Sequence, residues 1–205
     1  MPPTRKYEQR LRARAAEETR RRILDAAHQR LREAPSEPVG VDKVAKLAEV
    51  SRSTVYAVFG SRAGLFDALG MDLLERGGFT EMVRGVLHPD AREGLRRGVH
   101  GNVLMYAAHR DVLRALFSMA QLEAEAVAGA VRRLERGRAE GMNGLAGRLA
   151  EQGVLRGGLT AAQAADVLWL LTGFDSFDLL YTGRALPLDR VSAILVSTAE
   201  HALCS

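Results

Sequence analysis

The sequence predicts an all-α fold, and three observations lead to this prediction. Ala, Leu, Arg and Glu, which all favour helices, dominate the composition. Almost every segment with a readable hydrophobic period repeats every three or four residues, as expected on one face of a helix. No segment shows the alternation of apolar and polar residues, bounded by turn signals, that is typical of strands.

The N-terminal part is expected to hold one longer helix and two short ones. The first helix spans about residues 17–33, and the prolines of residues 34–40 end it. Its apolar face consists of Ile23, Leu24, Ala27 and Leu31. Two short helices follow at residues 41–48 and 52–59, and the next helix begins near Ser61.

The remainder of the chain predicts roughly five further helices separated by short breaks. The breaks fall at His88-Pro89, around His109-Arg110, at residues 153–160 and at residues 183–187. The last two helices, about 161–181 and 188–203, are strongly apolar, so we expect them to be buried. Because isologous contacts are the usual solution for a soluble homo-oligomer, we expect these helices to pair with their copies in a homodimer.

Positive charge is concentrated at one end of the chain. Residues 1–64 contain 14 Lys or Arg against 8 Asp or Glu, whereas residues 65–205 contain 15 against 17. A basic module beside a near-neutral body suits a polyanion such as nucleic acid, because neutralised phosphates release counterions. The alternative is that these charges simply lie on solvated helix faces.

The sequence also limits the compartment and the chemistry. Cys204 is the only cysteine, so no disulfide can form within the chain, and a reducing cytoplasm is the simplest location. We find no membrane-spanning segment and no secretion signal. The histidines form no metal-binding pattern, and nucleophile, phosphate-loop and dinucleotide motifs are absent, so we expect no metal, no cofactor and no enzymatic activity.

Residues 41–59 have the anatomy of a helix-turn-helix. Ser51 is a good N-cap for the second helix, because its hydroxyl can accept a hydrogen bond from a free backbone N–H. Small Ala45 allows the two helices to cross closely. Inward-facing apolar side chains are expected at Val44, Leu47, Ala48, Val50, Val55, Val58 and Phe59.

The outward face of the second helix carries small or hydrogen-bonding side chains. These are Arg52, Ser53, Thr54, Tyr56 and Ala57. A helix that enters the major groove presents few bulky groups and several donors or acceptors to base edges, and its N-terminal residues lead. The segment therefore predicts a helix that reads double-stranded DNA.

In these residues the chain resembles the tetracycline-repressor (TetR) family of transcriptional regulators. The resemblance runs from about Thr19 to Leu69 and includes the motif Thr54-x-Tyr56-x-x-Phe59-x-Ser61-Arg62-x-x-Leu65. It implies a basic arm and three-helix DNA-binding domain at residues 1–64, and a helical domain at 65–205 that dimerises and often binds a small-molecule effector. It also implies a sequence-specific regulator, a repressor released by its effector, that binds a palindromic operator as a homodimer.

The resemblance places the recognition helix at Arg52–Phe59. Arg52, Ser53 and Thr54 would approach bases or nearby phosphates, while Tyr56 and Arg62 would hold the backbone. The full set of expected DNA-binding residues is Lys43, Lys46, Ser51, Arg52, Ser53, Thr54, Tyr56, Ala57 and Arg62.

Three departures from the family pattern bear on specificity. Glu49 stands where the turn commonly has Gly, Arg62 replaces the usual Lys, and Ala57 and Val58 replace larger side chains. Glu49 and the small residues are the only support for an alternative function, a small-molecule sequestering or interaction module that no longer reads DNA.

The structure of the basic leading segment is left open by the sequence. Its charged residues include Arg5, Lys6, Arg10, Arg12 and Arg14. The segment is either a disordered tail, the first turns of an extended helix, or an arm that reaches an adjacent minor groove.

Aromatic and methionine residues of the C-terminal part are candidates for an effector pocket. The candidates are Met105, Tyr106, His109, Phe117, Trp169, Phe174 and Phe177. The polar neighbours Thr172, Asp175 and Asp178 favour a pocket, because ligand sites combine apolar walls with a few directional groups. The alternative is plain core, with Asp175 and Asp178 solvated or at the rim of an interface.

Overall fold

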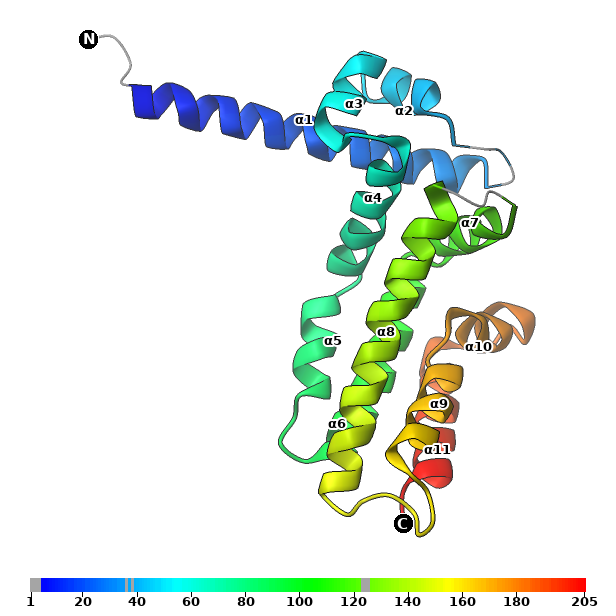
Figure 1. The fold of residues 1–205 in the computed structure, drawn as a ribbon. Coiled ribbons are helices and arrows are strands. Elements are labelled where there is room, and N and C mark those ends of the chain that lie inside the picture. The colour runs from blue at the N-terminus through cyan, green and yellow to red at the C-terminus, as the bar shows by residue number, and fades with distance from the viewer. Residues whose placement is uncertain (1–4, 36, 38, 123–125) are drawn as a thin grey trace. The chain divides into compact units, whose positions relative to one another are not determined.

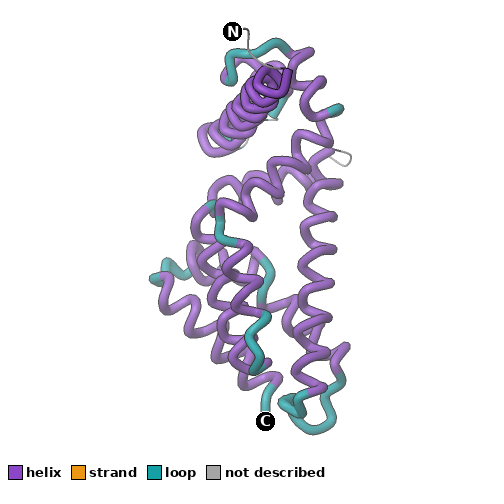
Figure 2. The backbone as a smooth tube through the Cα atoms, turned by 90° about the vertical axis from the view of Figure 1, so that its left-hand side faces the viewer, coloured by secondary structure: helices purple, strands orange, loops and turns teal. Residues whose placement is uncertain are grey.

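The computed structural model describes residues 5–35, 37, 39–122 and 126–205, and the regular structure in these ranges is entirely helical (Figures 1 and 2). The helices are α1 (Arg5–Glu33), α2 (Val41–Leu47), α3 (Arg52–Phe59), α4 (Arg62–Arg76), α5 (Phe79–Val86), α6 (Ala91–Ala108), α7 (Arg110–Leu122), α8 (Ala126–Glu151), α9 (Ala161–Leu171), α10 (Phe174–Asp178), the π-helix η1 (Leu179–Gly183) and α11 (Leu188–Leu203). The predicted all-α fold is confirmed. None of the described helices combines the length and the apolar character that crossing a membrane requires.

The chain divides into two compact units. The first comprises residues 1–72 and 114–131, and the second comprises residues 73–113 and 132–205. In the first unit α1 packs on α2, and α2 packs on α3. The side chains at the centre of this packing, Ile23, Leu31, Val44, Val55, Leu65 and Phe66, are all at most 1 % exposed. The first unit therefore has its own apolar core beneath the helix-turn-helix.

Helix α1 is much longer than the periodicity indicates, because it begins at Arg5 rather than near residue 17. The added turns contain no glycine or proline, and their Ala, Arg, Glu and Gln residues are good helix formers. An ion pair one turn apart, from Arg14 Nε to Glu18 Oε1 at 3.2 Å, adds modest support. Of the three structures left open for the leading segment, the first turns of an extended helix are observed from Arg5 onward.

In the second unit, glycines on one face of α6 let α5 lie directly against it. A Cβ at Gly94 would meet the carbonyl oxygen of Val86 at 2.6 Å, and a Cβ at Gly98 would meet Val86 Cγ2 at the same distance. Any larger residue would hold the two helices apart. On its other sides α6 packs against α11, which also contacts α9.

The C-terminal helices agree with the expected pattern at one end and differ at the other. Helix α11 spans Leu188–Leu203, as predicted. The single helix expected at 161–181 is instead α9, α10 and η1. The break follows Thr172, whose hydroxyl donates back to the Leu168 carbonyl at 2.7 Å, and Gly173 then adopts an extended conformation that caps α10. The Thr172 carbonyl in turn accepts from the side chains of Asn102 and Tyr106 on α6.

Candidate nucleic-acid interface

The turn between α2 and α3 is closed by the hydrogen bonds that the sequence predicts. Ser51 adopts an extended conformation, and its Oγ accepts from the backbone N–H of Thr54 at 3.0 Å, so the predicted N-cap is confirmed. On the other side of the turn, the Val50 N–H donates to the Ala45 carbonyl at 3.0 Å. These bonds fix the angle at which α3 leaves α2.

Glu49, the residue that stands in place of the usual Gly, adopts a left-handed conformation with φ of +53°. A Cβ in this region clashes with the following carbonyl, which costs roughly 1–2 kcal/mol relative to glycine. The surrounding hydrogen bonds hold the residue there. The turn therefore keeps its geometry without glycine, and it does so with local backbone strain.

Helix α2 buries Val44, Ala45 and the following Ala48, but it leaves Leu47 43 % exposed. The inward orientation expected for Leu47 is therefore wrong. Three residues rotate a helix by about 300°, so Leu47 lies about 60° beyond Val44, outside the buried face. Leu47 thus adds an apolar side chain to the surface beside the basic residues of α2.

The expected recognition residues of α3 lie on its outward side. Val55 is only 1 % exposed and anchors the helix to the core, whereas Val58 and Phe59 are partly buried. Ser51, Arg52, Ser53 and Ala57 are exposed, and Thr54 and Tyr56 are partly exposed. Six of the predicted DNA-binding residues are therefore brought together on one short helix and its cap.

Arg52 and Tyr56 form a small cluster with Asp42 at the start of α2. Arg52 Nη1 lies 3.2 Å from each carboxylate oxygen of Asp42, and Nη2 lies 3.4 Å from the Tyr56 hydroxyl. The hydrogen bond to Tyr56 and the negative charge of Asp42 raise the pKa of Arg52, so its charge is secure. Because the Arg52 and Asp42 side chains are both exposed, the ion pair between them is weak.

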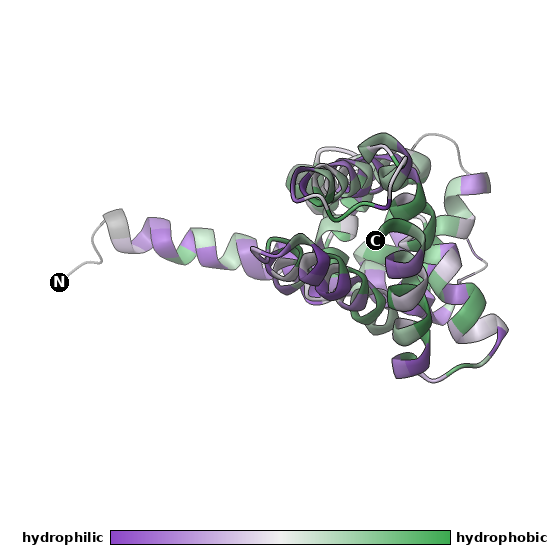
Figure 3. Cartoon of the chain, turned by 90° about the horizontal axis from the view of Figure 1, so that it is seen from below, coloured by the Kyte–Doolittle hydropathy of each residue, from purple (hydrophilic) through white to green (hydrophobic). Residues whose placement is uncertain are grey.

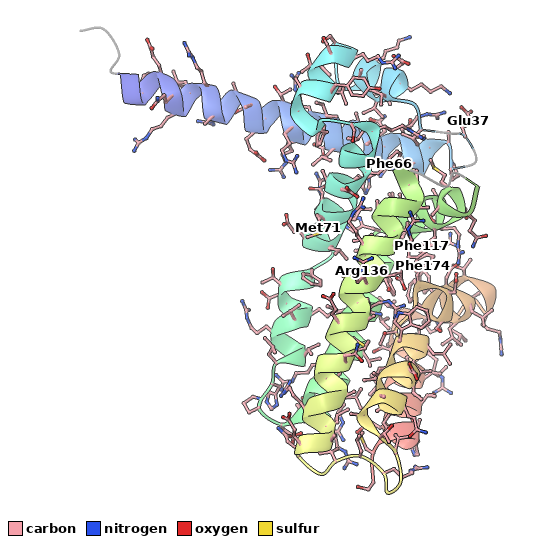
Figure 4. All side chains as sticks on the ribbon, in the orientation of Figure 1. Glu37, Phe66, Met71, Phe117, Arg136 and Phe174 are labelled. Atoms are coloured by element: carbon pink, nitrogen blue, oxygen red, sulfur yellow. The ribbon has the colours of Figure 1, made fainter. Side chains whose placement is uncertain are left out.

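The two lysines of α2 in the predicted DNA-binding set differ in whether another side chain of the protein already binds them. Lys43 Nζ binds Glu37 Oε2 at 2.8 Å, whereas Lys46 is exposed on α2. Glu37, labelled in Figure 4, also pairs with Arg30. Hydrogen bonds, first from Lys43 and then from Arg30, lower the pKa of Glu37. Lys43 therefore has a competing partner within the chain.

Arg62 is partly buried at the start of α4. Its Nε donates to the Val39 carbonyl at 3.3 Å, and its guanidinium carbon lies 5.2 Å from the centre of the Phe66 ring, which Figure 4 labels. The side chain thus braces the loop before α2 against α4. Its nearest role is to position the helix-turn-helix, and a phosphate contact by this residue stays a prediction.

Part of the predicted effector set forms a packed aromatic cluster in the second unit. The ring centres of Tyr106 and Phe174 are 5.4 Å apart, and those of Tyr106 and Phe177 are 5.8 Å apart. All three side chains are at most 5 % exposed. Burial raises the pKa of Tyr106, whose hydroxyl donates to the Thr172 carbonyl at 3.1 Å.

The other members of the set lie outside this cluster. Met105 is buried on α6, His109 is partly buried after α6, and Phe117 is partly buried on α7 in the first unit. Trp169 is 46 % exposed on α9, where the Arg138 guanidinium lies 4.9 Å from its ring centre.

Buried polar side chains around the aromatic cluster were not anticipated from the sequence. Asp178 is 7 % exposed and binds Arg110 at 2.6 Å, so the expectation of a solvated or rim position for this residue is wrong. The bond to Asp178 raises the pKa of Arg110. Asn102 Nδ2 donates to the Thr172 carbonyl at 2.9 Å. Asp175 is exposed, as expected.

The sequence model described as "Bacterial regulatory proteins, tetR family" matches residues 23–69, which include the whole helix-turn-helix. In these residues the chain is similar to the tetR family. Proteins of this family are transcription regulators rather than enzymes. No group of His, Cys, Asp or Glu within the described ranges is arranged to hold a metal ion.

Solved structures of TetR-family proteins share the fold of this chain. NalD, described as the secondary repressor of the MexAB-OprM multidrug efflux pump in Pseudomonas aeruginosa, is 23 % identical with a TM-score of 0.69, and the match covers 93 % of this chain and 98 % of NalD. PfmR, a TetR-family regulator from Thermus thermophilus, is 18 % identical with a TM-score of 0.62 over 89 % and 94 % of the two chains.

AibR, solved in complex with isovaleryl coenzyme A and operator DNA, is 16 % identical with a TM-score of 0.64, and the match covers 88 % of this chain and 97 % of AibR. No curated protein gives a significant match. The fold of this chain is therefore shared along nearly the whole length of each of the three structures.

Proposed function

We propose that this protein is a homodimeric regulator that binds a palindromic operator in double-stranded DNA, represses transcription there and is released by a small-molecule effector. The observation that carries the proposal is the outward face of α3. Its exposed residues, Arg52, Ser53 and Ala57, with Thr54 and Tyr56 beside them, combine small size with hydrogen-bonding capacity. A helix of this kind fits the major groove and offers partners to base edges.

The chemistry and position of each residue on this face indicate whether it contacts a base or a phosphate in the proposed complex. Ser53 and Thr54 lie in the first turn of α3, where the leading residues of a recognition helix meet base edges. Arg52 and Tyr56 lie one turn apart and share a hydrogen bond, so they offer a paired contact to one phosphate. Lys43 and Lys46 on α2 extend the positive surface along the backbone.

The proposed homodimer interface consists of the outward-facing surfaces of the C-terminal helices α9 and α11. Helix α11 buries Val191, Leu195 and Leu203, while the opposite side exposes Ala193 and Ser197. Small residues on an exposed helix face allow a second helix to approach closely. On α9, Trp169 and Leu170 are 46 % and 65 % exposed, which is the apolar surface that an isologous interface would cover.

Effector release is proposed through the second unit. The aromatic cluster of Tyr106, Phe174 and Phe177 is bordered by the directional groups Asn102 and Thr172, a combination that suits ligand recognition. The AibR complex contains both an acyl coenzyme A and operator DNA, which supports by analogy a regulator with two ligands. A ligand that prefers one spacing of the recognition helices would weaken DNA binding, and DNA would weaken ligand binding by the same factor.

The decisive experiment is selection of random double-stranded DNA by the purified full-length protein at near-physiological salt, followed by sequencing. We expect a two-fold symmetric site with half-sites about one helical turn, or a multiple of it, apart. Recovery of unrelated fragments bound with equal affinity would overturn the proposal and favour the sequestering module. The same preparations should be dimeric by sedimentation velocity.

The effector can be sought with a signal that the chain itself supplies. Trp169 is the only tryptophan, and it lies on the helix that leads into the aromatic cluster. A compound that binds near the cluster should shift the tryptophan emission and release the selected DNA in the same concentration range. A compound that shifts the emission but leaves DNA affinity unchanged is not the effector.

A further inference from the structure

We propose that the first part of α1, residues 5–16, is a helical arm that binds the phosphates of DNA flanking the operator half-site. This inference rests on the proposed function and extends it to a surface outside the helix-turn-helix. We refer to residues 5–16 as the α1 arm. Figure 1 shows this part of α1 running out beyond α2 and α3 of the same unit, and Figure 3 shows the same N-terminal stretch of helix from below.

The α1 arm has no packing role in the described chain. All ten side chains from Tyr7 to Ala16 are exposed, whereas the core of the first unit begins on α1 at Ile23. The arm contains five Lys or Arg residues and one Glu, so its net charge is +4. A solvated helix with this charge is held by its continuity with the packed part of α1, and it complements a polyanion.

The direction that the arm faces can be read from the helical register. Arg20 lies with its guanidinium carbon 5.1 Å from the centre of the Phe59 ring, which marks the side of α1 that looks toward α3. Gln9 and Ala16 precede Arg20 by eleven and four positions, so with about 100° per residue they lie on the same side. This side of the arm therefore faces the side of the unit on which α3 would hold DNA.

Basic residues border that face on both sides. Arg10 lies on one flank and Arg12 on the other, with Gln9, Ala13 and Ala16 between them. Small central residues allow the helix backbone to come close to a phosphate ridge while long side chains reach past it on either side. Leu11 and Ala15 lie on the opposite face and offer nothing to a phosphate, whereas Arg14 lies one turn after Arg10 and continues that flank.

The dimensions suit the flank of a half-site. Twelve residues of helix span about 18 Å, which corresponds to about five base pairs of duplex. Contacts to phosphates carry no sequence information, so the arm would extend the footprint and strengthen binding without changing the selected sequence. An arm that reads the minor groove would instead change the selected sequence, and an arm that binds a second copy would change the oligomeric state. The experiment below measures both.

The test compares two double variants that lose the same charge from the same helix. The first is Arg10→Gln with Arg12→Gln, which removes both flanks of the DNA-facing side. The matched control is Arg22→Gln with Arg32→Gln, because both side chains are exposed outside the arm and point away from the Arg20 side of α1. Fluorescence anisotropy with the selected operator is recorded between about 50 and 200 mM salt, where the slope of log affinity counts phosphate contacts.

For the first variant we expect a slope that is smaller by about two and an affinity that falls by roughly five- to thirtyfold, with the selected sequence unchanged. For the control, the slope of log affinity against log salt concentration should stay within about 0.5 of the wild-type value. Trimming about five base pairs from each flank should weaken the wild type but not the first variant. Equal losses in the two variants, or a wild type that is insensitive to trimming, would overturn the arm proposal.

The two proposals fail in different ways. If the full-length protein selects no DNA sequence, the proposed function fails and the arm has no operator to extend. If the protein selects an operator but both variants bind it like the wild type, the arm proposal alone is wrong. A changed oligomeric state of the first variant in sedimentation velocity would mean that the arm binds a second copy, and would also overturn the proposal. Circular dichroism of both variants confirms that α1 stays helical.

Discussion

Arg52 Nη1 lies 3.2 Å from both carboxylate oxygens of Asp42, so the first residue of α3 is tied to the first turn of α2. Both side chains are exposed, so this weak ion pair orients the guanidinium without locking it. In the proposed interface the Asp42 carboxylate would lie beside DNA phosphates. It would repel them and compete with them for the Arg52 guanidinium. Asp42 is therefore expected to lower DNA affinity in the proposed interface.

Replacing Asp42 by Asn should strengthen operator binding about three- to tenfold, because removal of one charge near the phosphates is worth about 1 kcal/mol at the surface. The amide keeps the size of the side chain, and the exposed ion pair itself contributes little to folding. Anisotropy titrations at two salt concentrations measure the effect, which should shrink at high salt. Unchanged affinity at low salt would mean that Asp42 lies away from the DNA.

Tyr56→Ala should weaken operator binding by about tenfold or more while the protein remains a folded dimer, because a hydrogen bond to phosphate and the ring that supports Arg52 are both lost. Tyr56→Phe separates the two effects, since it keeps the ring 5.6 Å from the Arg52 guanidinium carbon and removes only the hydroxyl. We expect an intermediate affinity for this variant. A gel-shift titration in which Tyr56→Ala binds like the wild type would contradict the phosphate role.

Local signals in the sequence predict much of the fold and of the proposed interface. The cap at Ser51 and the bounds of α11 follow from residues within the same helix, and both agree with the structure. The outward residues of α3 follow from the spacing that buries Val55. These features depend on interactions between near neighbours, which a single sequence contains.

Features that depend on distant residues could not be predicted in this way. The burial of Asp178 requires its partner Arg110, which lies 68 positions earlier on another helix. The end of α9 depends on Thr172, whose carbonyl also accepts from Asn102 and Tyr106 of α6. The left-handed φ of Glu49 was not predicted either, because it follows from the path of the chain through the turn.

Glu49→Gly should increase the free energy of unfolding by about 0.5–1 kcal/mol, since glycine removes the strain of a left-handed residue but adds freedom to the unfolded chain. Chemical denaturation of the full-length protein measures the change. Glu49→Ala is the control, because alanine removes the carboxylate but keeps the Cβ. If alanine stabilises the protein as much as glycine does, the charge and not the backbone conformation is responsible.

Gly94→Ala should lower the free energy of unfolding by about 1–3 kcal/mol, because the new Cβ would lie 2.6 Å from a backbone oxygen of α5. Gly141→Ala on α8 provides the opposite case, since a Cβ there meets nothing within 4 Å. This variant should gain about 0.5–1 kcal/mol from the better helix propensity of alanine. A stabilising Gly94→Ala would show that α5 and α6 can move apart at no cost.

Ala193→Glu combined with Ser197→Glu should convert the proposed dimer into folded monomers, because both positions are exposed on the side of α11 that faces away from its core residues. Two copies related by a two-fold axis would bring four carboxylates into one desolvated interface, where unpaired charges cost several kcal/mol. Sedimentation velocity and circular dichroism measure mass and folding together.

A monomer can bind only one half-site at a time, so the DNA affinity of the double variant should fall far more than that of a variant in α3 alone. Dimers that persist in the double variant would place the interface on another surface, and Trp169→Glu with Leu170→Glu on α9 would then test the exposed apolar pair.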